Sequence, residues 1–466
     1  MLVFLCIMGK DALRSLEETV LAFCNLSHLQ ELRIENCPPL AEKHLQILTS
    51  LTTLKIHRSS IMFPPLARSD ARWKLPVQRL DIWSWSASGK ELTRLLSHLP
   101  NLYCLDIRTC EKITRLGVEV EQQQTVAVDQ QPEIEQEVEE EEVVMEQEED
   151  DDGLLLLPAH LSDCLKVVHI GFFKELTLTT KKSGTGGGRL QAMRSLKKLH
   201  IADCPNFLSA YTASDDLSSC CPFPSSLRDL KLQTRSLQET KRLEGRMEGM
   251  GAVAHLSNLT SLKKLSICLG EDLRCEGLWH LLTQGQLTTL QVTGGPRFFV
   301  GLDPAQALQV QGEQEQSSSK LQRLETGDIP GVLAAPVCRF LSSSLTKLSF
   351  NFNEDVEPFR KEQEEALSLL TSLQELRFGW CDKLRRLPAG LNNLTNLKIL
   401  VIEGCPAIRS LPKNGIPSSL EELGFEDCTS LQITDPWVST HQVAAKEWPP
   451  QLAARVRCPS TQSFPK

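Results

Sequence analysis

The strongest constraint on the fold is a spacing of apolar residues that repeats near the C-terminal end of the chain. In the first copy, Leu373, Leu376 and Phe378 are separated by two residues and then by one, and Cys381 follows. The same L-x-x-L-x-L-x-x-C pattern returns after 24 and then after 23 residues. A period of this length is typical of chains built from stacked units that share one fold.

The alternation within each copy predicts a short β-strand. Successive side chains of a strand point to opposite faces, so we expect Leu376 and Phe378 in a core and Arg377 in solvent. A small side chain with a weak S–H donor fits the buried corner after the strand, which is the role predicted for Cys381, Cys405 and Cys428. One unit cannot bury its apolar face alone, whereas stacked units share a continuous core. These features are the leucine-rich-repeat signature.

We therefore predict an α/β solenoid. Its form is an irregular leucine-rich-repeat horseshoe, with a parallel β-sheet on the concave face and short helices, 3-10 turns or loops on the convex face. The apolar residues MLVFLCIM at the N-terminal end are expected to begin a structured segment. Fourteen strands are predicted from the spacing, with their leading apolar residues at Leu29, Leu51, Val77, Leu102, Leu165, Leu196, Leu227, Leu262, Leu287, Leu321, Leu345, Leu373, Leu397 and Leu420.

An acidic stretch interrupts the array. Residues 119–152 contain sixteen Asp and Glu and no Lys or Arg, which is too much like charge and too little apolar surface to order the chain. Without them the formal net charge of −9 becomes +7, so the remaining chain is mildly basic. We predict repeats over 1–116, a disordered acidic insert over 117–153, repeats over 154–433, and a C-terminal cap and frayed tail over 434–466.

Cysteine usage indicates a reducing compartment. Six of the sixteen cysteines occupy the corner position of a repeat, where packing explains them better than disulfide bonding does. The apolar N-terminal run is too short for a membrane span. It also lacks the basic region that precedes the apolar part of a secretory signal. We expect a cytoplasmic protein without a membrane span.

The sequence contains no recognisable catalytic or metal-binding pattern. Neither Gly9-Lys10 nor Gly89-Lys90 has the glycine that a phosphate-binding loop needs five residues earlier. No C-x-x-C pair, H-E-x-x-H motif or G-x-S-x-G nucleophile motif is present. We expect no enzymatic activity, no cofactor and no metal site.

The remaining candidate is a surface formed by strand residues that point away from the core. Aromatic residues of the kind that anchor protein interfaces occur there among basic residues, so the surface is either a protein-binding face or an ordinary solvated face. The basic positions are interrupted by Thr, Ser and Asp, so no nucleic-acid partner is expected. The acidic insert is either a passive expansion or a tethered shield for this surface. The candidate residues are Lys55, His57, Arg58, Trp83, Tyr103, Arg108, Lys197, Lys198, His200, Lys263, Lys264, Lys347, Arg377, Trp380 and Lys398.

The C-terminal copies carry a family resemblance. The phrases LRRLPAGL, GCPAIRSLP and IPSSLEEL in combination resemble the C-terminal leucine-rich-repeat region of plant intracellular nucleotide-binding disease resistance proteins of the coiled-coil class. Residues 16–40 and 194–208 are similar in phrasing. The resemblance implies a role in plant defense. The partner would be a pathogen effector, a guarded host protein, or a nucleotide-binding module acting in trans.

The chain departs from that family because the coiled coil and the nucleotide-binding module are missing, so ATP-driven switching is not implied. We therefore expect a repeat-only protein, a decayed copy or a truncated gene product. The alternative is an F-box-type leucine-rich-repeat substrate receptor of a ubiquitin ligase, suggested by CEKITRLG at 110–117 and CTSLQITD at 428–435. An extracellular receptor ectodomain is disfavoured by the absence of its L-x-G-x-I-P phrase.

Overall fold

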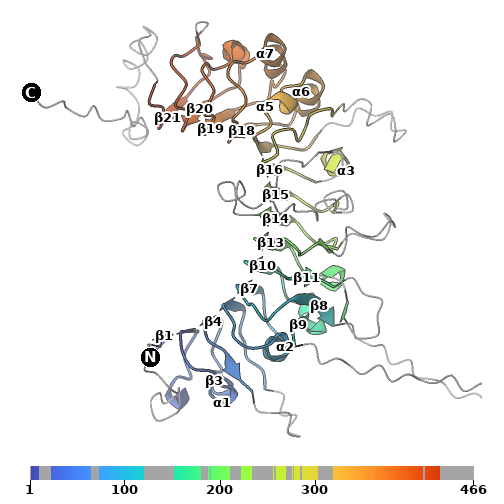
Figure 1. Cartoon of the computed structure of the whole chain (residues 1–466), viewed down its shortest axis with the longest axis vertical. Coiled ribbons are helices and arrows are strands. Elements are labelled where there is room, and N and C mark those ends of the chain that lie inside the picture. The colour runs from blue at the N-terminus through green and yellow to red at the C-terminus, as the bar shows by residue number, and fades with distance from the viewer. Residues whose placement is uncertain are drawn as a thin grey trace, which may run out of the picture. The chain divides into compact units, whose positions relative to one another are not determined.

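The structure is a computed structural model of the whole chain, and it falls into two compact units that are described separately (Figure 1). Unit 1 comprises residues 1–166 and 172–195, and unit 2 comprises residues 167–171 and 196–466. The structure describes residues 2–9, 23–63, 73–119, 152–179, 187–188, 190–209, 222–233, 256, 259–268, 275, 278–283, 286–302, 319–412 and 415–430.

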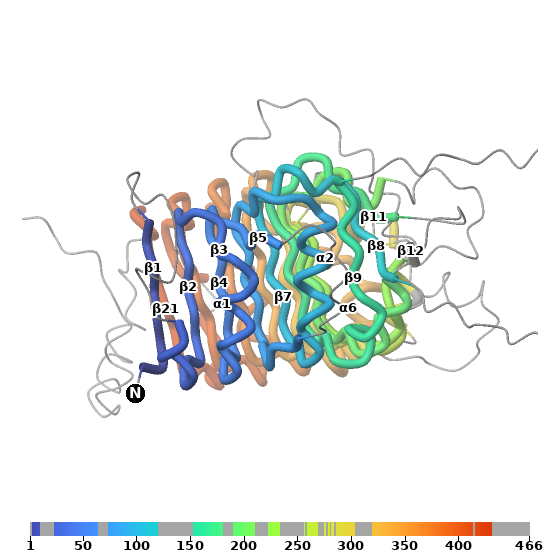
Figure 2. Tube along the Cα trace, turned by 90° about the horizontal axis from the view of Figure 1, so that it is seen from below, coloured from blue at the N-terminus to red at the C-terminus, as the bar shows by residue number. Residues whose placement is uncertain are grey.

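Unit 1 is built on a parallel sheet in which consecutive repeats lie side by side (Figure 2). Leu32, Leu54, Leu80 and Leu105 stand opposite one another in register, and each is fully buried. The L-x-L spacing thus places one apolar residue of every repeat at the same level of the core. The strands, in order, are β1 (Phe4–Met8), β2 (Glu31–Glu35), β4 (Thr53–His57), β6 (Arg79–Trp83) and β7 (Cys104–Arg108).

Short elements return the chain between the strands of unit 1. The most regular is α2 (Gly89–Ser97), where a capping box joins Ser88 and Glu91 and where Leu92, Leu95 and Leu96 are buried. The others are η1 (Phe23–Asn25), β3 (Leu40–Ala41), α1 (Glu42–Gln46), β5 (Ile61–Met62), η2 (Ala159–Asp163) and η3 (Leu190–Ala192).

A second sheet in unit 1 was not predicted. Strand β8 (Arg115–Glu119) pairs in parallel with β9 (Leu154–Leu157) and β11 (Thr177–Leu178), and antiparallel with β12 (Gly187–Gly188). The backbone N–H of Leu156 in β9 also donates to the Thr93 hydroxyl of α2, at 2.9 Å. This sheet therefore lies against the returning helix.

The same sheet corrects the predicted ends of the acidic insert. Residues 117–119 belong to β8, and the carbonyls of Asp152 and Gly153 accept backbone hydrogen bonds from Gly89 and Thr114. The predicted insert, 117–153, thus included residues at both ends that belong to the folded unit. The strand pattern in RLGVE is short and is followed directly by acidic residues, so the sequence did not show where the strand ends. Residues 120–151, like the predicted cap and tail over 434–466, lie outside the described residues.

Unit 2 repeats the plan of unit 1, and its described residues form ten parallel strands. Their inward leucines are buried from Leu199 in the second strand to Leu400 in the ninth. Fully burying such a side chain stabilises the fold by about 1.5–3 kcal/mol before the entropy cost is subtracted. The strands are β10 (Val167–Gly171), β13 (Lys198–Ala202), β14 (Asp229–Gln233), β15 (Lys264–Cys268), β16 (Thr289–Thr293), β17 (Arg323–Thr326), β18 (Lys347–Asn351), β19 (Glu375–Gly379), β20 (Ile399–Glu403) and β21 (Glu422–Glu426).

The returning segments of unit 2 are short helices and turns. Helix α5 (Ile329–Val332) begins at Asp328, whose carboxylate accepts the Gly331 N–H at 2.8 Å. The others are α3 (Trp279–Thr283), α6 (Ala335–Leu341), α7 (Lys361–Leu367) and η7 (Ala389–Asn393). Both units thus have the predicted leucine-rich-repeat fold. A parallel sheet forms one side, and short helices, 3-10 turns and loops form the other.

The corner role predicted for the cysteines is confirmed. The Sγ atoms of Cys381, Cys405 and Cys428 donate to carbonyls of the preceding repeat at 3.6–3.7 Å, and all three side chains are buried. Each thiol therefore makes weak hydrogen bonds to the backbone at its buried corner. All fourteen predicted strands are present, and MLVFLCIM supplies one more, β1.

Candidate functional site: the outward faces of the two sheets

We use the term outward face for the side of each main sheet formed by strand residues that alternate with the buried ones. Nine of the fifteen candidate residues lie within strands, and the other six directly precede or follow a strand. The flanking six are Arg58, Tyr103, Lys197, Lys263, Trp380 and Lys398. Six candidates belong to unit 1 and nine to unit 2.

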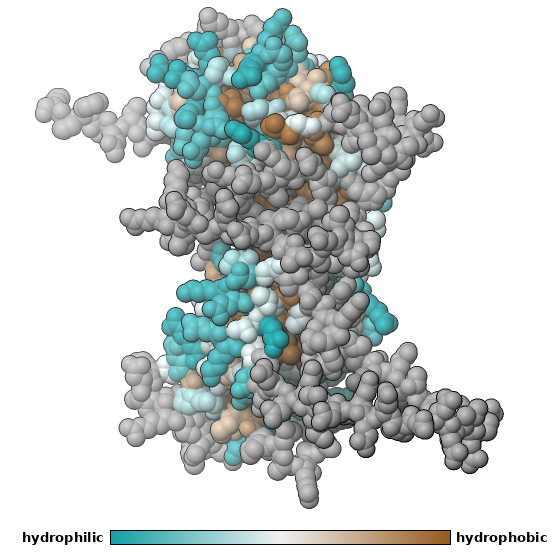
Figure 3. Space-filling view, turned by 45° about the vertical axis from the view of Figure 1, so that its right-hand side comes forward, coloured by the Kyte–Doolittle hydropathy of each residue, from teal (hydrophilic) through white to brown (hydrophobic). Residues whose placement is uncertain are grey.

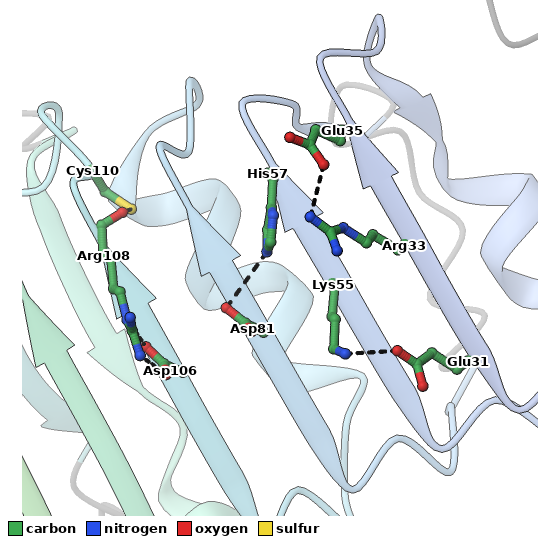
Figure 4. Close-up of polar contacts among 9 residues, drawn as sticks. All are labelled: Glu31, Arg33, Glu35, Lys55, His57, Asp81, Asp106, Arg108 and Cys110. Carbon is green, nitrogen blue, oxygen red and sulfur yellow. Dashed lines mark hydrogen bonds and ion pairs between the residues drawn. The ribbon is translucent and has the colours of Figure 1, made fainter. Parts of the chain in front are cut away.

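On unit 1, the candidate bases are paired with acids of the same face (Figure 4). Lys55 Nζ lies 2.7 Å from Glu31 Oε1, and His57 Nε2 lies 3.8 Å from Asp81 Oδ1. Both are diagonal pairs between neighbouring strands, since Glu31 stands directly opposite Thr53, and Asp81 directly opposite Lys55. Acidic and basic side chains are thus intermixed on this face, although Asp81 stands directly opposite Asp106 of the next strand.

Two further pairs of unit 1 form within single strands. Arg108 donates to Asp106 through Nε and Nη2, at 2.8 and 2.6 Å, and Asp106 is almost fully buried. These hydrogen bonds raise the pKa of the Arg108 guanidinium above its ordinary value. Arg33 donates to Glu35 at 2.8 Å. On unit 1 the acids Glu31, Glu35, Asp81 and Asp106 therefore offset the bases of the outward face.

The aromatic candidates of unit 1 remain accessible. Trp83 is 47% exposed and meets His57 edge-on at a centroid distance of 5.6 Å. Tyr103 is 48% exposed, and Lys166 Nζ lies 5.4 Å from the centre of its ring. Arg58 follows β4 at a positive φ of 49°, and its backbone N–H donates to the Trp83 carbonyl. Each ring thus keeps about half of its surface available to a partner.

On unit 2, bases are concentrated at the start of three neighbouring strands. Lys198 and Lys264 stand in register on either side of Asp229. The exposed Lys197 and Lys263 precede them. Sequence reasoning missed Arg228, Lys231 and Arg323, although all three occupy the same L-x-x-L-x-L positions.

Farther along unit 2, the candidate bases are again paired. Lys347 Nζ lies 2.8 Å from Glu375 Oε2, and Arg377 Nε lies 2.5 Å from Glu375 Oε1. Burial raises the pKa of the Glu375 carboxyl, but its hydrogen bonds to Lys347 and Arg377 outweigh burial and hold the pKa below its ordinary value. Lys398 pairs with Glu421 at 3.0 Å. These bases therefore neutralise local acids.

Two candidates of unit 2 are aromatic or imidazole groups. His200 meets His169 of β10 edge-on at 5.6 Å between ring centres. Trp380 follows β19 with a positive φ of 53° and is 46% exposed. The left-handed backbone at Trp380 was not predicted from the sequence.

The described residues offer little catalytic chemistry. No cluster of three or more His, Cys, Asp or Glu side chains among them could hold a metal ion. Burial raises the pKa of the thiols of Cys110 and Cys338 to about 12, so neither is a ready nucleophile. No helix within the described part of the chain is long and apolar enough to cross a membrane. The surface in Figure 3 mixes hydrophilic and hydrophobic residues in both units.

Fold and surface together define the class of the chain: a leucine-rich-repeat solenoid that presents charged and aromatic side chains on its sheets. No protein-family model matches the chain. No curated protein matches it either. A solved structure described as "Crystal structure of TLR13-ssRNA13 complex" is similar at 15% identity with a TM-score of 0.41. The alignment covers 88% of this chain and 56% of that one, and a likeness at this level carries no functional argument.

Proposed function

We propose that the chain is a non-enzymatic protein-binding scaffold that recognises its partner through the outward faces of its sheets. The observation that carries the proposal is the exposure of Trp83, Tyr103 and Trp380, each about half accessible on a face whose strands are otherwise fixed by a buried core. Aromatic residues held on a rigid support supply most of the binding free energy in many protein interfaces. Acids and bases are intermixed on the unit 1 face, which favours a protein partner over a polyanion such as RNA.

The resemblance of the C-terminal repeats to plant disease resistance proteins suggests the biological setting. On this proposal the partner is a pathogen effector, a guarded host protein or a nucleotide-binding module supplied in trans. Co-purification of the chain with a separately expressed nucleotide-binding module would support the last of these. The second candidate, a substrate receptor of a ubiquitin ligase, requires co-purification with the adaptor protein that binds F-box segments.

Photo-crosslinking tests the scaffold proposal directly. We would introduce benzoylphenylalanine at Tyr103, with Lys43 as the matched control, because Lys43 is exposed on α1 among the returning segments of unit 1. The proposal expects cross-linked products from position 103 that protease removes and nuclease does not. Products that nuclease removes, or equal yields from both positions, would contradict it.

The bases of unit 2 provide an independent test. Reversing Lys197, Lys198, Lys263 and Lys264 to Glu should abolish capture of a partner that this surface holds. Because Asp229 lies between Lys198 and Lys264, the reversal also places like charges side by side and destabilises the sheet. The corresponding Gln variant removes the positive charges without adding negative ones, and unchanged capture by it would remove these lysines from the interface.

A further inference from the structure

The outward face of unit 2 becomes apolar at its last described strands. Ile399 and Val401 occupy outward positions of β20, where most other strands of the unit carry polar or charged residues. Val401 stands opposite Gly424 of β21, and the absence of a side chain at Gly424 leaves that flank of Val401 uncovered. A shallow apolar surface therefore lies on β20.

Two exposed aromatic side chains lie at the ends of the two preceding strands. Trp380 follows β19 and Phe352 follows β18, with φ values of 53° and 57° and with 46% and 50% of their surface exposed. Each is fixed through its backbone, because its N–H donates to the next strand, Trp380 to Glu403 at 2.8 Å and Phe352 to Gly379 at 3.0 Å.

The indole of Trp380 lies directly over the backbone of the next repeat. A Cβ atom built on Gly404 would come within 2.7 Å of Trp380 Cε3 and 2.8 Å of Cδ2. Only glycine allows this approach, so Gly404 holds the ring in a defined orientation. A half-exposed indole held in this way is an anchor that loses little side-chain entropy when a partner binds.

Acidic residues border the apolar surface on its β21 side and at the end of β20, whereas Arg377, which is paired with Glu375, stands opposite Val401 on the β19 side. Glu403 and Glu426 stand opposite each other in register, Glu422 stands opposite Ile399, and Asp427 follows β21. Among the described residues, no Lys, Arg or His forms an ion pair with any of these four acids, whereas the nearby Glu375 and Glu421 are paired. Neighbouring like charges destabilise a sheet, and a bound cation relieves that repulsion.

We propose that this surface binds an extended, cationic segment of a partner protein in which Arg or Lys alternates with apolar residues. We call it the β20 patch: Phe352, Trp380, Ile399, Val401, Glu403 and Glu426. An Arg side chain stacks on Trp380 and donates to Glu403, while the apolar residues of the segment cover Val401 and Phe352. The proposal rests on the proposed scaffold function and names the partner chemistry of one of its faces.

Fluorescence anisotropy with the full chain tests this proposal. The probe is a fluorescein-labelled nonapeptide of alternating Arg and Leu, and a Glu–Leu peptide of equal length is the control peptide. We expect the Arg–Leu peptide to bind and the Glu–Leu peptide not to bind. Trp380→Ala should raise the dissociation constant about tenfold, and Trp380→Phe, which keeps a weaker aromatic face, about threefold.

A matched pair of double variants separates the patch from overall charge. Glu403→Gln with Glu426→Gln should weaken binding about tenfold. Glu111→Gln with Glu175→Gln removes the same two charges from exposed turns of unit 1, outside the outward face, and should leave binding unchanged. Circular dichroism checks that each variant is folded. If Trp380→Ala does not fold, the variant with Glu403→Gln and Glu426→Gln still tests the patch, because these substitutions are conservative.

Several results would overturn the proposal. They are no binding of the Arg–Leu peptide, equal losses in the two double variants, and tighter binding of a fluorescein-labelled single-stranded RNA that the same Trp380 variants weaken. Failure of the peptide with retained cross-links at Tyr103 would reject the β20 patch and leave the scaffold function standing. Loss of the cross-links as well would reject both.

Discussion

The contact between Gly404 and Trp380 gives a quantitative prediction. Gly404 has a φ of +58°, a conformation that costs an L-residue about 1–2 kcal/mol. In Gly404→Ala the new methyl group would also lie 2.7 Å from the indole, so the ring must move, and overpacking of this kind costs about 1–3 kcal/mol. We therefore expect the substitution to destabilise β20 by about 2–5 kcal/mol in total.

A second glycine separates the two contributions. Gly415 also has a positive φ, +81°, but no atom lies within 4 Å of a Cβ built there. Gly415→Ala should therefore carry the backbone cost alone, about 1–2 kcal/mol. The difference between the two variants measures the displacement of the indole.

Hydrogen exchange of the β20 amides is the appropriate assay, because the stability of a solenoid is local to neighbouring repeats. A double-mutant cycle with Trp380→Ala tests whether the extra cost of Gly404→Ala comes from the indole, because in the Trp380→Ala background there is no ring to displace. The reasoning is refuted if Gly404→Ala costs no more than Gly415→Ala, or if its cost is the same with and without the indole.

Three further predictions concern buried groups. Asp328→Ala removes a carboxylate that accepts the N–H groups of Phe299 and Gly331, and it should destabilise the neighbouring repeats by about 2–4 kcal/mol by hydrogen exchange, whereas Asp328→Asn should cost less. Burial lowers the pKa of His98 in the folded chain, so the unfolded chain binds the proton at a higher pH than the folded chain does. The free energy of unfolding should therefore fall as the pH drops below about 6.5, and it should stop falling below the pKa of the folded state. In urea titrations at several pH values, His98→Phe should remove this dependence on pH. Burial raises the pKa of Cys110 to about 12, so iodoacetamide at pH 8 should label the exposed Cys6 before Cys110. Peptide mapping measures the labelling of each residue, and equal labelling of the two would contradict the burial of Cys110.

The sequence predicted the main sheets well because one local rule defines every strand. Leucines two positions apart must face the same core, so the register follows once the spacing is recognised. The second sheet of unit 1 obeys no such rule. Strand β8 pairs with β9, which follows the long acidic insert, and with β11 and β12, which have two residues each. Pairing between such short and distant segments leaves no periodic signal.

The outward faces were predicted only in part, for a different physical reason. The same spacing that identified Lys55 and Arg108 also places Glu31, Asp81 and Asp106 on that face, so the residue types were available. The charge balance was missed because ion pairs depend on diagonal neighbours. Lys55 reaches Glu31, which belongs to the previous strand and stands opposite Thr53. Only the strand order converts a list of bases into a charge pattern.

The left-handed positions at the strand ends support a functional role for the β20 patch. Asn36, Asp203 and Asp427 occupy this conformation in other repeats, and Asn and Asp adopt it at low cost. Arg58, Ser84, Thr109 and Phe172 occupy it as well, so the conformation is a recurrent feature of the strand ends. Phe352 and Trp380 occupy it with bulky side chains that are also half exposed. Backbone strain and exposed apolar surface each reduce stability, and here both fall on the same two residues of consecutive repeats. Unfavourable choices concentrated in this way are typical of a binding surface, which is why we assign the extended cationic segment to the β20 patch and not to the balanced charges of unit 1.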